Sequence, residues 1–408
     1  MRCILAAGVC ATLSVIGAAC SEAATSTNAI ESSEAVATSA TIATPPGTSG
    51  SMPAETAGPT SPATSMPPVA TEPGDARCED STSPAPDQIA PPVQLGVPLA
   101  ATVTTCSRLE AGSNLVADGS ILWMSEQLSD LTDVVFAVDP SSLQRTRMIA
   151  TPEFVIAKAA TSTTLWAVAT SAGGHPLHFL QIDIATGTVI TQTEVAGTAV
   201  ADGPEPAASI AIAGDDVWMS VANGPHVVAH YRSDGTLITR VPLRSSPVEL
   251  AAVTGHAYAI TERGDVVAID ASTNTTTTLA TLPASAIGNA VIAASGSDLW
   301  ADTTELVHID LESGVVTARR PALVLDLAAS PAEPGRVWAA PFEPDPSEFP
   351  GSGAGSVVRL TMHGVEPDGV LFFQTTMSNG INRLAVANDG TVYGENEYTS
   401  QVVRIVPD

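Results

Sequence analysis

The chain has 408 residues, of which 43 are acidic and 16 basic, so its formal net charge at pH 7 is −27. A surface this acidic repels nucleic acid and anionic lipid, and neither is an expected partner. Such a surface would favour cations or cationic ligands, or it would serve solubility alone.

Residues 1–19 have the pattern of an export signal. Arg2 supplies the positive start, and residues 3–17 form an apolar stretch too short to span a bilayer as a mature helix. Residues 17–19 are small, and the following Cys20 is similar to the acceptor of a bacterial lipoprotein processing site. We expect a lipid on Cys20, such as palmitate, and anchoring to the outer face of the cytoplasmic membrane. Ordinary signal cleavage at the same bond is the alternative.

Residues 20–90 are predicted to form a disordered tether. From Ser21 to Asp75 the chain is almost wholly Ser, Thr, Ala, Pro and Gly, and no aromatic residue precedes Trp123. Such a segment buries too little apolar surface to offset its ordering entropy. As a flexible coil it would hold a folded domain about 40–50 Å from its anchor, toward the cell wall. The single lysine, Lys158, and the abundant alanine are typical of a high-GC, actinobacterial source.

Cysteine usage predicts one disulfide. Cys3 and Cys10 lie in the export signal and Cys20 is the predicted lipid acceptor, which leaves Cys78 and Cys106. Two such cysteines in an oxidising compartment are expected to pair.

Seven aromatic residues recur 38 to 55 residues apart, which is the spacing of β-propeller blades. They are Trp123, Trp166, Trp218, Tyr258, Trp300, Trp338 and Tyr393. Each follows an apolar strand and a Gly/Asp/Ser turn, and a third and often a fourth strand come after it. We therefore predict an all-β fold over residues 91–408: a seven-bladed β-propeller of four-stranded antiparallel blades.

The last repeat lacks an outer strand, because only residues 402–406 read as a strand after Tyr393. Residues 99–105 are strand-like and belong to no other repeat. We expect this N-terminal strand to complete the seventh blade and close the ring, with a Cys78–Cys106 disulfide as a brace.

Two segments carry a family resemblance: 118–126, DGSILWMSE, and 389–395, DGTVYGE, which is followed by VVRI. They resemble blades of the NHL and virginiamycin B lyase-like group of seven-bladed propellers, over about residues 93–408. The resemblance implies the fold. Lyases of that group use a histidine base and a divalent metal at the mouth of the central channel, and no histidine of this sequence matches that role.

No linear motif assigns catalytic, cofactor-binding or metal-ligating residues. His226 and His230 have helical chelate spacing but lie in a strand region, where they would be about 13 Å apart. Ligand binding is instead expected in the loops between second and third strands. The candidates are Glu126, His175, His226, Arg263, Asp302, Phe342, Phe349 and Glu395. The long sixth-repeat loop that holds both phenylalanines is a binding loop or a tolerated insertion.

The sequence therefore favours a monomeric, surface-tethered lipoprotein whose propeller is a non-catalytic scaffold for an unknown protein or small-molecule ligand outside the cell, with no cofactor. It would touch the membrane only through its lipid. The alternative is a lyase or hydrolase of the virginiamycin B lyase-like type, with a divalent metal and its site at the mouth of the central channel.

Overall fold

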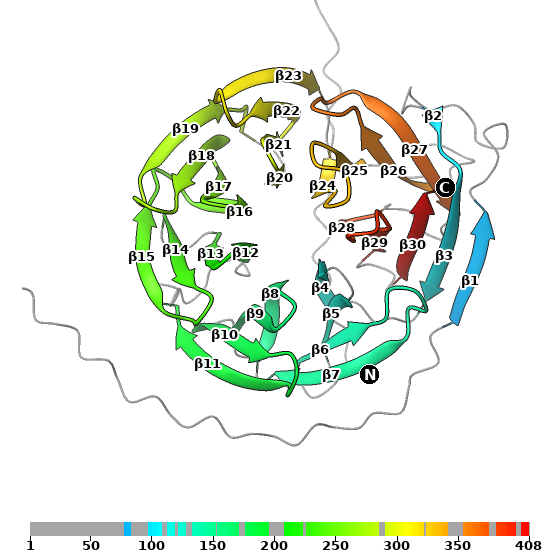
Figure 1. Ribbon diagram of the computed structural model, residues 1–408, viewed down its shortest axis with the longest axis horizontal. Coiled ribbons are helices and arrows are strands. Elements are labelled where there is room, and N and C mark those ends of the chain that lie inside the picture. Colours follow the sequence, from blue (N-terminus) through cyan, green and yellow to red (C-terminus); the bar gives the residue numbers. More distant parts are fainter. Residues whose placement is uncertain are drawn as a thin grey trace, which may run out of the picture. The chain divides into compact units, whose positions relative to one another are not determined.

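The fold consists of seven sheets, each with four antiparallel strands that form one blade of a propeller (Figure 1). The computed structural model describes residues 77–82, 97–107, 112–118, 121–127, 133–151, 153–170, 176–195, 208–222, 226–284, 290–321, 324–341, 354–374, 381–396 and 401–407. All of them belong to one compact unit, 61–408. Within these ranges no helix is long and apolar enough to span a membrane.

In blades 1 to 6 the four strands follow one another in chain order. Blade 1 contains β4 (Gly112–Asp118), β5 (Ile121–Gln127), β6 (Asp133–Val138) and β7 (Arg145–Thr151). Blade 2 contains β8 (Phe154–Ala160), β9 (Thr164–Thr170), β10 (Leu177–Asp183) and β11 (Thr188–Glu194). Blade 3 contains β12 (Ala208–Ala213), β13 (Asp216–Val221), β14 (Val227–Arg232) and β15 (Leu237–Pro242).

Blades 4 to 6 repeat this order, and blade 7 takes its fourth strand from the N-terminal part of the propeller. Blade 4 contains β16 (Pro247–Val253), β17 (His256–Thr261), β18 (Asp265–Asp270) and β19 (Thr276–Thr281). Blade 5 contains β20 (Val291–Ser295), β21 (Asp298–Asp302), β22 (Glu305–Asp310) and β23 (Val315–Pro321). Blade 6 contains β24 (Val324–Ala329), β25 (Val337–Pro341), β26 (Ala354–Leu360) and β27 (Pro367–Gln374). Blade 7 contains β28 (Arg383–Val386), β29 (Val392–Asn396), β30 (Gln401–Pro407) and β3 (Ala101–Ser107).

The first strands of the blades line the centre of the ring, and the fourth strands form its rim (Figure 1). Each innermost strand lies beside that of the next blade, and β28 lies beside β4, so the ring is closed. Because neighbouring strands are antiparallel, the ring has two distinct faces. We call them the turn face, with the turns between strands 1 and 2 and between strands 3 and 4, and the loop face, with the connections between strands 2 and 3 and between blades.

The seventh blade combines both ends of the propeller, which confirms the predicted closure. Strand β3 pairs antiparallel with β30 along its whole length, with Ala101 opposite Pro407 and Ser107 opposite Gln401. It lies two residues later in the chain than the predicted 99–105. A second N-terminal strand, β2 (Val97–Pro98), pairs in parallel with β27 of blade 6.

A fifth strand on blade 7, β1 (Arg77–Thr82), corrects the predicted extent of the tether, which was placed over residues 20–90. The polar sequence of β1 carries no pattern that predicts a strand. An edge strand can form without one, because main-chain hydrogen bonds to one neighbour hold it and it needs no apolar face. Cys78 lies directly opposite Cys106 in the β1–β3 register. Directly opposed residues of antiparallel strands have the Cα separation that a disulfide needs. The disulfide stays a prediction, which this register supports.

The recurring aromatic side chains form the core between blades, and all seven are at least 96% buried. Trp123 packs with Val155 and Leu165 of blade 2, and Trp218 packs with Leu250 of blade 4. Truncating a buried tryptophan to alanine costs about 3–5 kcal/mol of stability. The aromatic repeat is therefore an architectural feature, as its spacing predicted.

Candidate functional site

The predicted ligand residues on the loop face are only partly loop residues. His226 and Arg263 are exposed at the loop face. Glu126 lies within β5, Asp302 ends β21, and Glu395 lies within β29. These three are strand residues, which corrects their assignment to loops.

Asp302 and Glu395 are buried, because neighbouring blades cover the second strands. His175, Phe342 and Phe349 lie outside the described residues. Ligand binding by the eight residues stays a prediction.

Acidic side chains link the inner strands of successive blades near the loop face. The Oε2 atom of Glu249 in β16 accepts a hydrogen bond from the backbone N of Ile292, at 3.0 Å. The Oδ2 atom of Asp326 in β24 accepts one from the backbone N of Leu384, at 2.7 Å. Both acids follow a β-bulge, which supplies the extra residue that turns the side chain toward the next blade.

Burial shifts the titration of these acids toward neutral pH. It raises the pKa of Glu249 to about 8, and the Asp326 carboxyl adds to the rise while the Arg383 guanidinium opposes it. Burial raises the pKa of Asp326 to about 6, again against Arg383. Burial also raises the pKa of Asp302 to about 7. Carboxyl groups with such pKa values can hold or release a proton near pH 7. Glu249 and Asp326, however, each accept a hydrogen bond from a backbone N–H group of the next blade, so their role is to join blades.

The turn face carries an open cavity of about 520 Å³ at the mouth of the ring. It is formed where the inner strands of blades 3 to 6 end. Its walls are Ala213, Ala252, Val253, Thr254, Ala294, Ser295, Gly296, Ala329 and Pro331. None of these nine residues is acidic or basic, and their side chains offer apolar surface and two hydroxyl groups.

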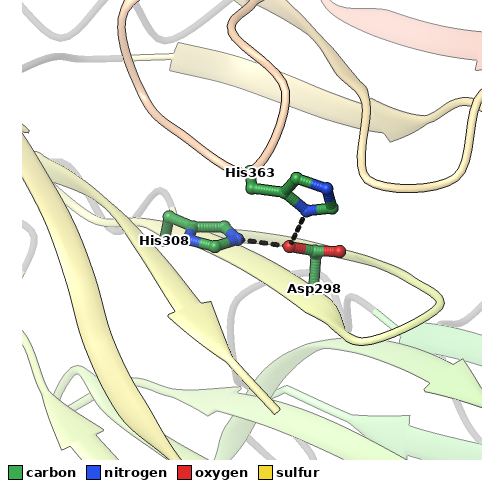
Figure 2. Close-up of side chains that lie close together, drawn as sticks. All are labelled: Asp298, His308 and His363. Carbon is green, nitrogen blue, oxygen red and sulfur yellow. Dashed lines mark hydrogen bonds and ion pairs between the residues drawn. The ribbon is translucent and has the colours of Figure 1, made fainter. Parts of the chain in front are cut away.

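An acid and two histidines meet on the same face, between blades 5 and 6 (Figure 2). Asp298 begins β21, His308 lies in β22, and His363 lies in the turn between β26 and β27. The Oδ1 atom of Asp298 is 2.7 Å from His308 Nε2 and 2.7 Å from His363 Nδ1. Asp298 and His308 are buried, whereas the side chain of His363 is 58% exposed.

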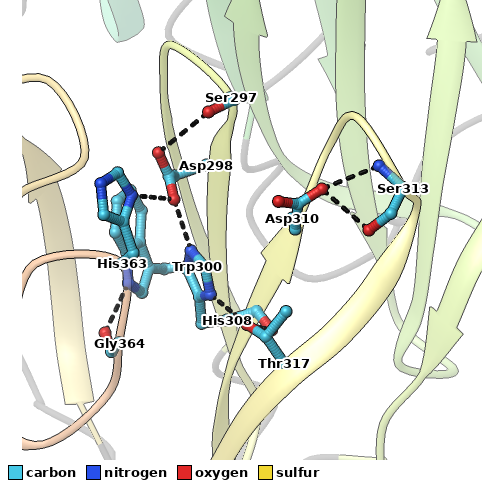
Figure 3. A network of polar contacts seen from close by, with 9 residues as sticks. All are labelled: Ser297, Asp298, Trp300, His308, Asp310, Ser313, Thr317, His363 and Gly364. Atoms are coloured by element: carbon cyan, nitrogen blue, oxygen red, sulfur yellow. Dashed lines mark hydrogen bonds and ion pairs between the residues drawn. The ribbon is translucent and has the colours of Figure 1, made fainter.

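Further contacts fix the orientation of this cluster (Figure 3). The other ring nitrogen of His308, Nδ1, contacts the hydroxyl of Thr317 in β23. Trp300 Nε1 donates to the carbonyl oxygen of Gly364 at 2.8 Å and thereby ties the His363 turn to blade 5. Asp310 closes the β22–β23 turn through the backbone N and hydroxyl of Ser313.

Blade 3 contains a related arrangement. Asp216 and Trp218 stand in β13 as Asp298 and Trp300 stand in β21, and His230 Nε2 is 2.9 Å from Asp216 Oδ1. Here the third partner is an amide, because Asn274 Oδ1 lies 2.8 Å from His230 Nδ1. The Asp–His pair therefore recurs in blades 3 and 5, and within the part of the chain that the structure describes the blade 5 copy is the one that adds a second histidine.

Sequence reasoning missed the acids of the inner strands and the Asp298 cluster, because in each case the members come from different blades. The only linear signal for the cluster is the recurrence of Asp-x-Trp followed by a histidine in the next strand, in blades 3 and 5.

No protein-family model and no curated protein sequence matches the chain. Solved structures with a similar fold include a chain titled "Structure of U3-55K", at TM-score 0.53 and 11% identity, covering 73% of this chain and 97% of that one. A chain of "Crystal Structure of Mitotic Checkpoint Complex" has TM-score 0.53 and 12% identity and covers 85% and 97%. "Crystal structure of RRP9 WD40 repeats" has TM-score 0.53 and 11% identity and covers 73% and 96%. At these identities the likeness shows the fold alone: a seven-bladed propeller.

Proposed function

We propose that this chain is a surface-tethered lipoprotein whose propeller binds a protein or small-molecule ligand outside the cell without transforming it. The observation that carries the binding role is the open cavity of about 520 Å³ on the turn face. Four blades contribute to it, and its walls are short side chains at the ends of the inner strands and in the turns that follow them. Concave sites of this size are typical of ligand binding.

The chemistry of the walls favours binding over catalysis. General acid–base catalysis needs a titratable group within hydrogen-bond reach of the substrate, and the nine wall residues contain none. Thr254 and Ser295 carry hydroxyls, yet neither has a histidine or acid beside it in the wall to activate it. A ligand at this mouth would meet apolar side chains and the hydroxyls of Thr254 and Ser295.

Membrane attachment is proposed from Cys20 and from the composition of residues 21–75. Wild-type protein is expected to partition into detergent with the membrane fraction, and Cys20→Ala is expected to release the protein to the medium. Fractionation of cells with an intact lipidation pathway, followed by immunoblotting, measures this. Soluble wild-type protein in such cells would rule out the anchor.

A screen of metabolites and metal ions by thermal shift tests the binding role. A ligand of the turn-face mouth is expected to raise the melting temperature of the wild-type chain, because it binds only the folded state. Ala294→Trp places a bulky indole in the cavity wall and should weaken or abolish that shift. Thr277→Trp places the same side chain on the exposed outer strand β19 and should leave the shift intact.

The same screen separates binding from catalysis. Each ligand that shifts the melting temperature is incubated with the protein and then analysed by mass spectrometry. Recovery of the unchanged ligand supports a binding propeller. Conversion of the ligand to a product by wild type, but not by Ala294→Trp, would make the chain an enzyme and overturn the proposal.

A further inference from the structure

We propose that Asp298, His308 and His363 bind a divalent transition-metal ion, of which zinc fits best, between blades 5 and 6. The three residues offer one carboxylate oxygen and two imidazole nitrogens, all within 4.8 Å of one another. Zinc commonly takes two histidines and one carboxylate and keeps a fourth position for water or another ligand. Calcium and magnesium prefer sites built from oxygen atoms.

The distances between the ligand atoms are close to those around a bound zinc ion, but shorter for the two contacts to Asp298. The two contacts to Asp298 Oδ1 measure 2.7 Å each, which is a hydrogen-bond distance. Ligand atoms around a tetrahedral zinc ion, with bonds of about 2.0–2.1 Å, are about 3.3 Å apart. Entry of the ion therefore requires each contact to lengthen by about 0.6 Å. A small rotation of the His363 side chain, which is largely exposed, can lengthen its own contact to Asp298, and the contact between Asp298 and His308 has to lengthen by a shift of the Asp298 carboxylate.

Surrounding groups hold each ligand in place, as the outer contacts of metal sites do. The Thr317 hydroxyl faces His308 Nδ1, so its oxygen can accept a hydrogen bond from the Nδ1–H group while Nε2 faces the metal. The backbone N of His363 donates to the carbonyl oxygen of Gly335 at 3.0 Å. The imidazole of His363 packs on the same glycine, where an added Cβ would stand 2.4 Å from its Cε1 atom. A larger residue at position 335 would displace the ring.

The Asp216–His230 pair of blade 3 lacks a feature that the blade 5 cluster has. There the third partner contacts Nδ1 of His230, on the opposite side of the ring from Asp216. An amide at that place cannot complete a cluster with the carboxylate. In blade 5 the third partner converges on the carboxylate oxygen itself and is a histidine. Asn274→Ala in blade 3 is therefore a matched control for His363→Ala, since each removes the third partner of an Asp–His pair.

Zinc titration of the full chain tests the site. The protein is freed of metal with a chelator, and zinc chloride is added in a calorimeter. Wild type and Asn274→Ala are expected to bind one zinc ion more per chain than His363→Ala, or to bind that ion at least 10-fold more tightly. Because His363 is largely exposed, its removal should leave the fold intact, which circular dichroism verifies. Any zinc that binds to the cysteines does so equally in wild type, Asn274→Ala and His363→Ala, so it does not affect the difference between them.

Two further readouts report the coordination itself. Cobalt(II) added in place of zinc should give the visible absorption bands of a tetrahedral nitrogen and oxygen site in wild type but not in His363→Ala. Gly335→Ala should weaken zinc binding although it alters no ligand. Equal zinc binding by wild type and His363→Ala, or none by either, would overturn the proposal and leave the cluster as an inter-blade hydrogen-bond clamp.

Discussion

A chain that lacks residues 91–106 is expected to melt at a far lower temperature than the full chain, or not to fold, whereas deletion of residues 21–75 should have little effect. The first deletion removes β2 and nearly all of β3, and with β3 the outer strand of blade 7. Ala101 and Val103 of that strand are buried against Val403 and Ile405 of β30. Their loss exposes an edge strand and apolar surface, at a cost of about 1.5–3 kcal/mol for each large buried side chain.

Thermal unfolding followed by circular dichroism measures both deletions. Reduction of the wild-type chain supplies a milder perturbation of the same blade. Opening a loop of the size between Cys78 and Cys106 should lower stability by about 3–4 kcal/mol in the chain-entropy model. A truncated chain that begins near Ser107 and melts like the full protein would contradict the closure.

The free energy of unfolding is expected to fall as pH rises from about 5 to 8. Glu249 and Asp326 have pKa values raised to about 8 and about 6 in the folded state. Between the unfolded and folded pKa values the native state binds more protons than the unfolded state, so raising the pH favours unfolding. Each such proton contributes a slope of about 1.4 kcal/mol per pH unit. The stability that these acids contribute at low pH is lost once pH exceeds the folded pKa.

Other carboxyls act in a lower pH window. Hydrogen bonds from neighbouring Ser and Thr residues lower the pKa values of Asp139 and Asp270 to about 2. Their contribution is present above the unfolded pKa, near 4, and is lost as pH falls toward 2. The decline between pH 5 and 8 therefore belongs to the buried acids, and maximal stability should lie at mildly acidic pH.

Glu249→Gln isolates the effect, because the amide oxygen can still accept from the backbone N of Ile292 while the titration is removed. Chemical denaturation at several pH values should show a flatter pH dependence for Glu249→Gln than for wild type, and higher stability at pH 8. Glu262→Gln, at an exposed position after β17, is the matched control and should reproduce the wild-type profile. An unchanged slope in Glu249→Gln would show that this carboxyl does not carry the effect.

Sequence reasoning was most effective where the signal is local and repeated. Trp123 and its six counterparts each occupy a buried place in the second strand of a blade, and the same physical demand recurs in every repeat. The closing strand could also be predicted, because an unpaired edge in blade 7 needs a partner and the N-terminal run has strand character. Strand β1 could not be predicted, because its polar residues show no apolar pattern.

The candidate site was less accessible to sequence reasoning. Asp298 and His308 are ten positions apart, but His363 comes from the next blade, so its approach depends on how blades 5 and 6 pack. Glu249, Asp326 and Arg383 likewise come from three blades. Asp302 and Glu395 were expected in loops because both stand near strand ends, yet strand pairing continues through them and buries them.

Photo-crosslinking in living cells tests the binding role most directly. A photoreactive residue replaces Thr254 at the turn-face mouth or, as a control, the exposed Ile190 on outer strand β11. A binding propeller should give a discrete crosslinked adduct from position 254 and none from position 190, and Ala294→Trp in the same chain should weaken or abolish it. The absence of an adduct at 254, or an adduct that persists undiminished when Ala294→Trp places its indole in the cavity wall, would contradict binding at this mouth.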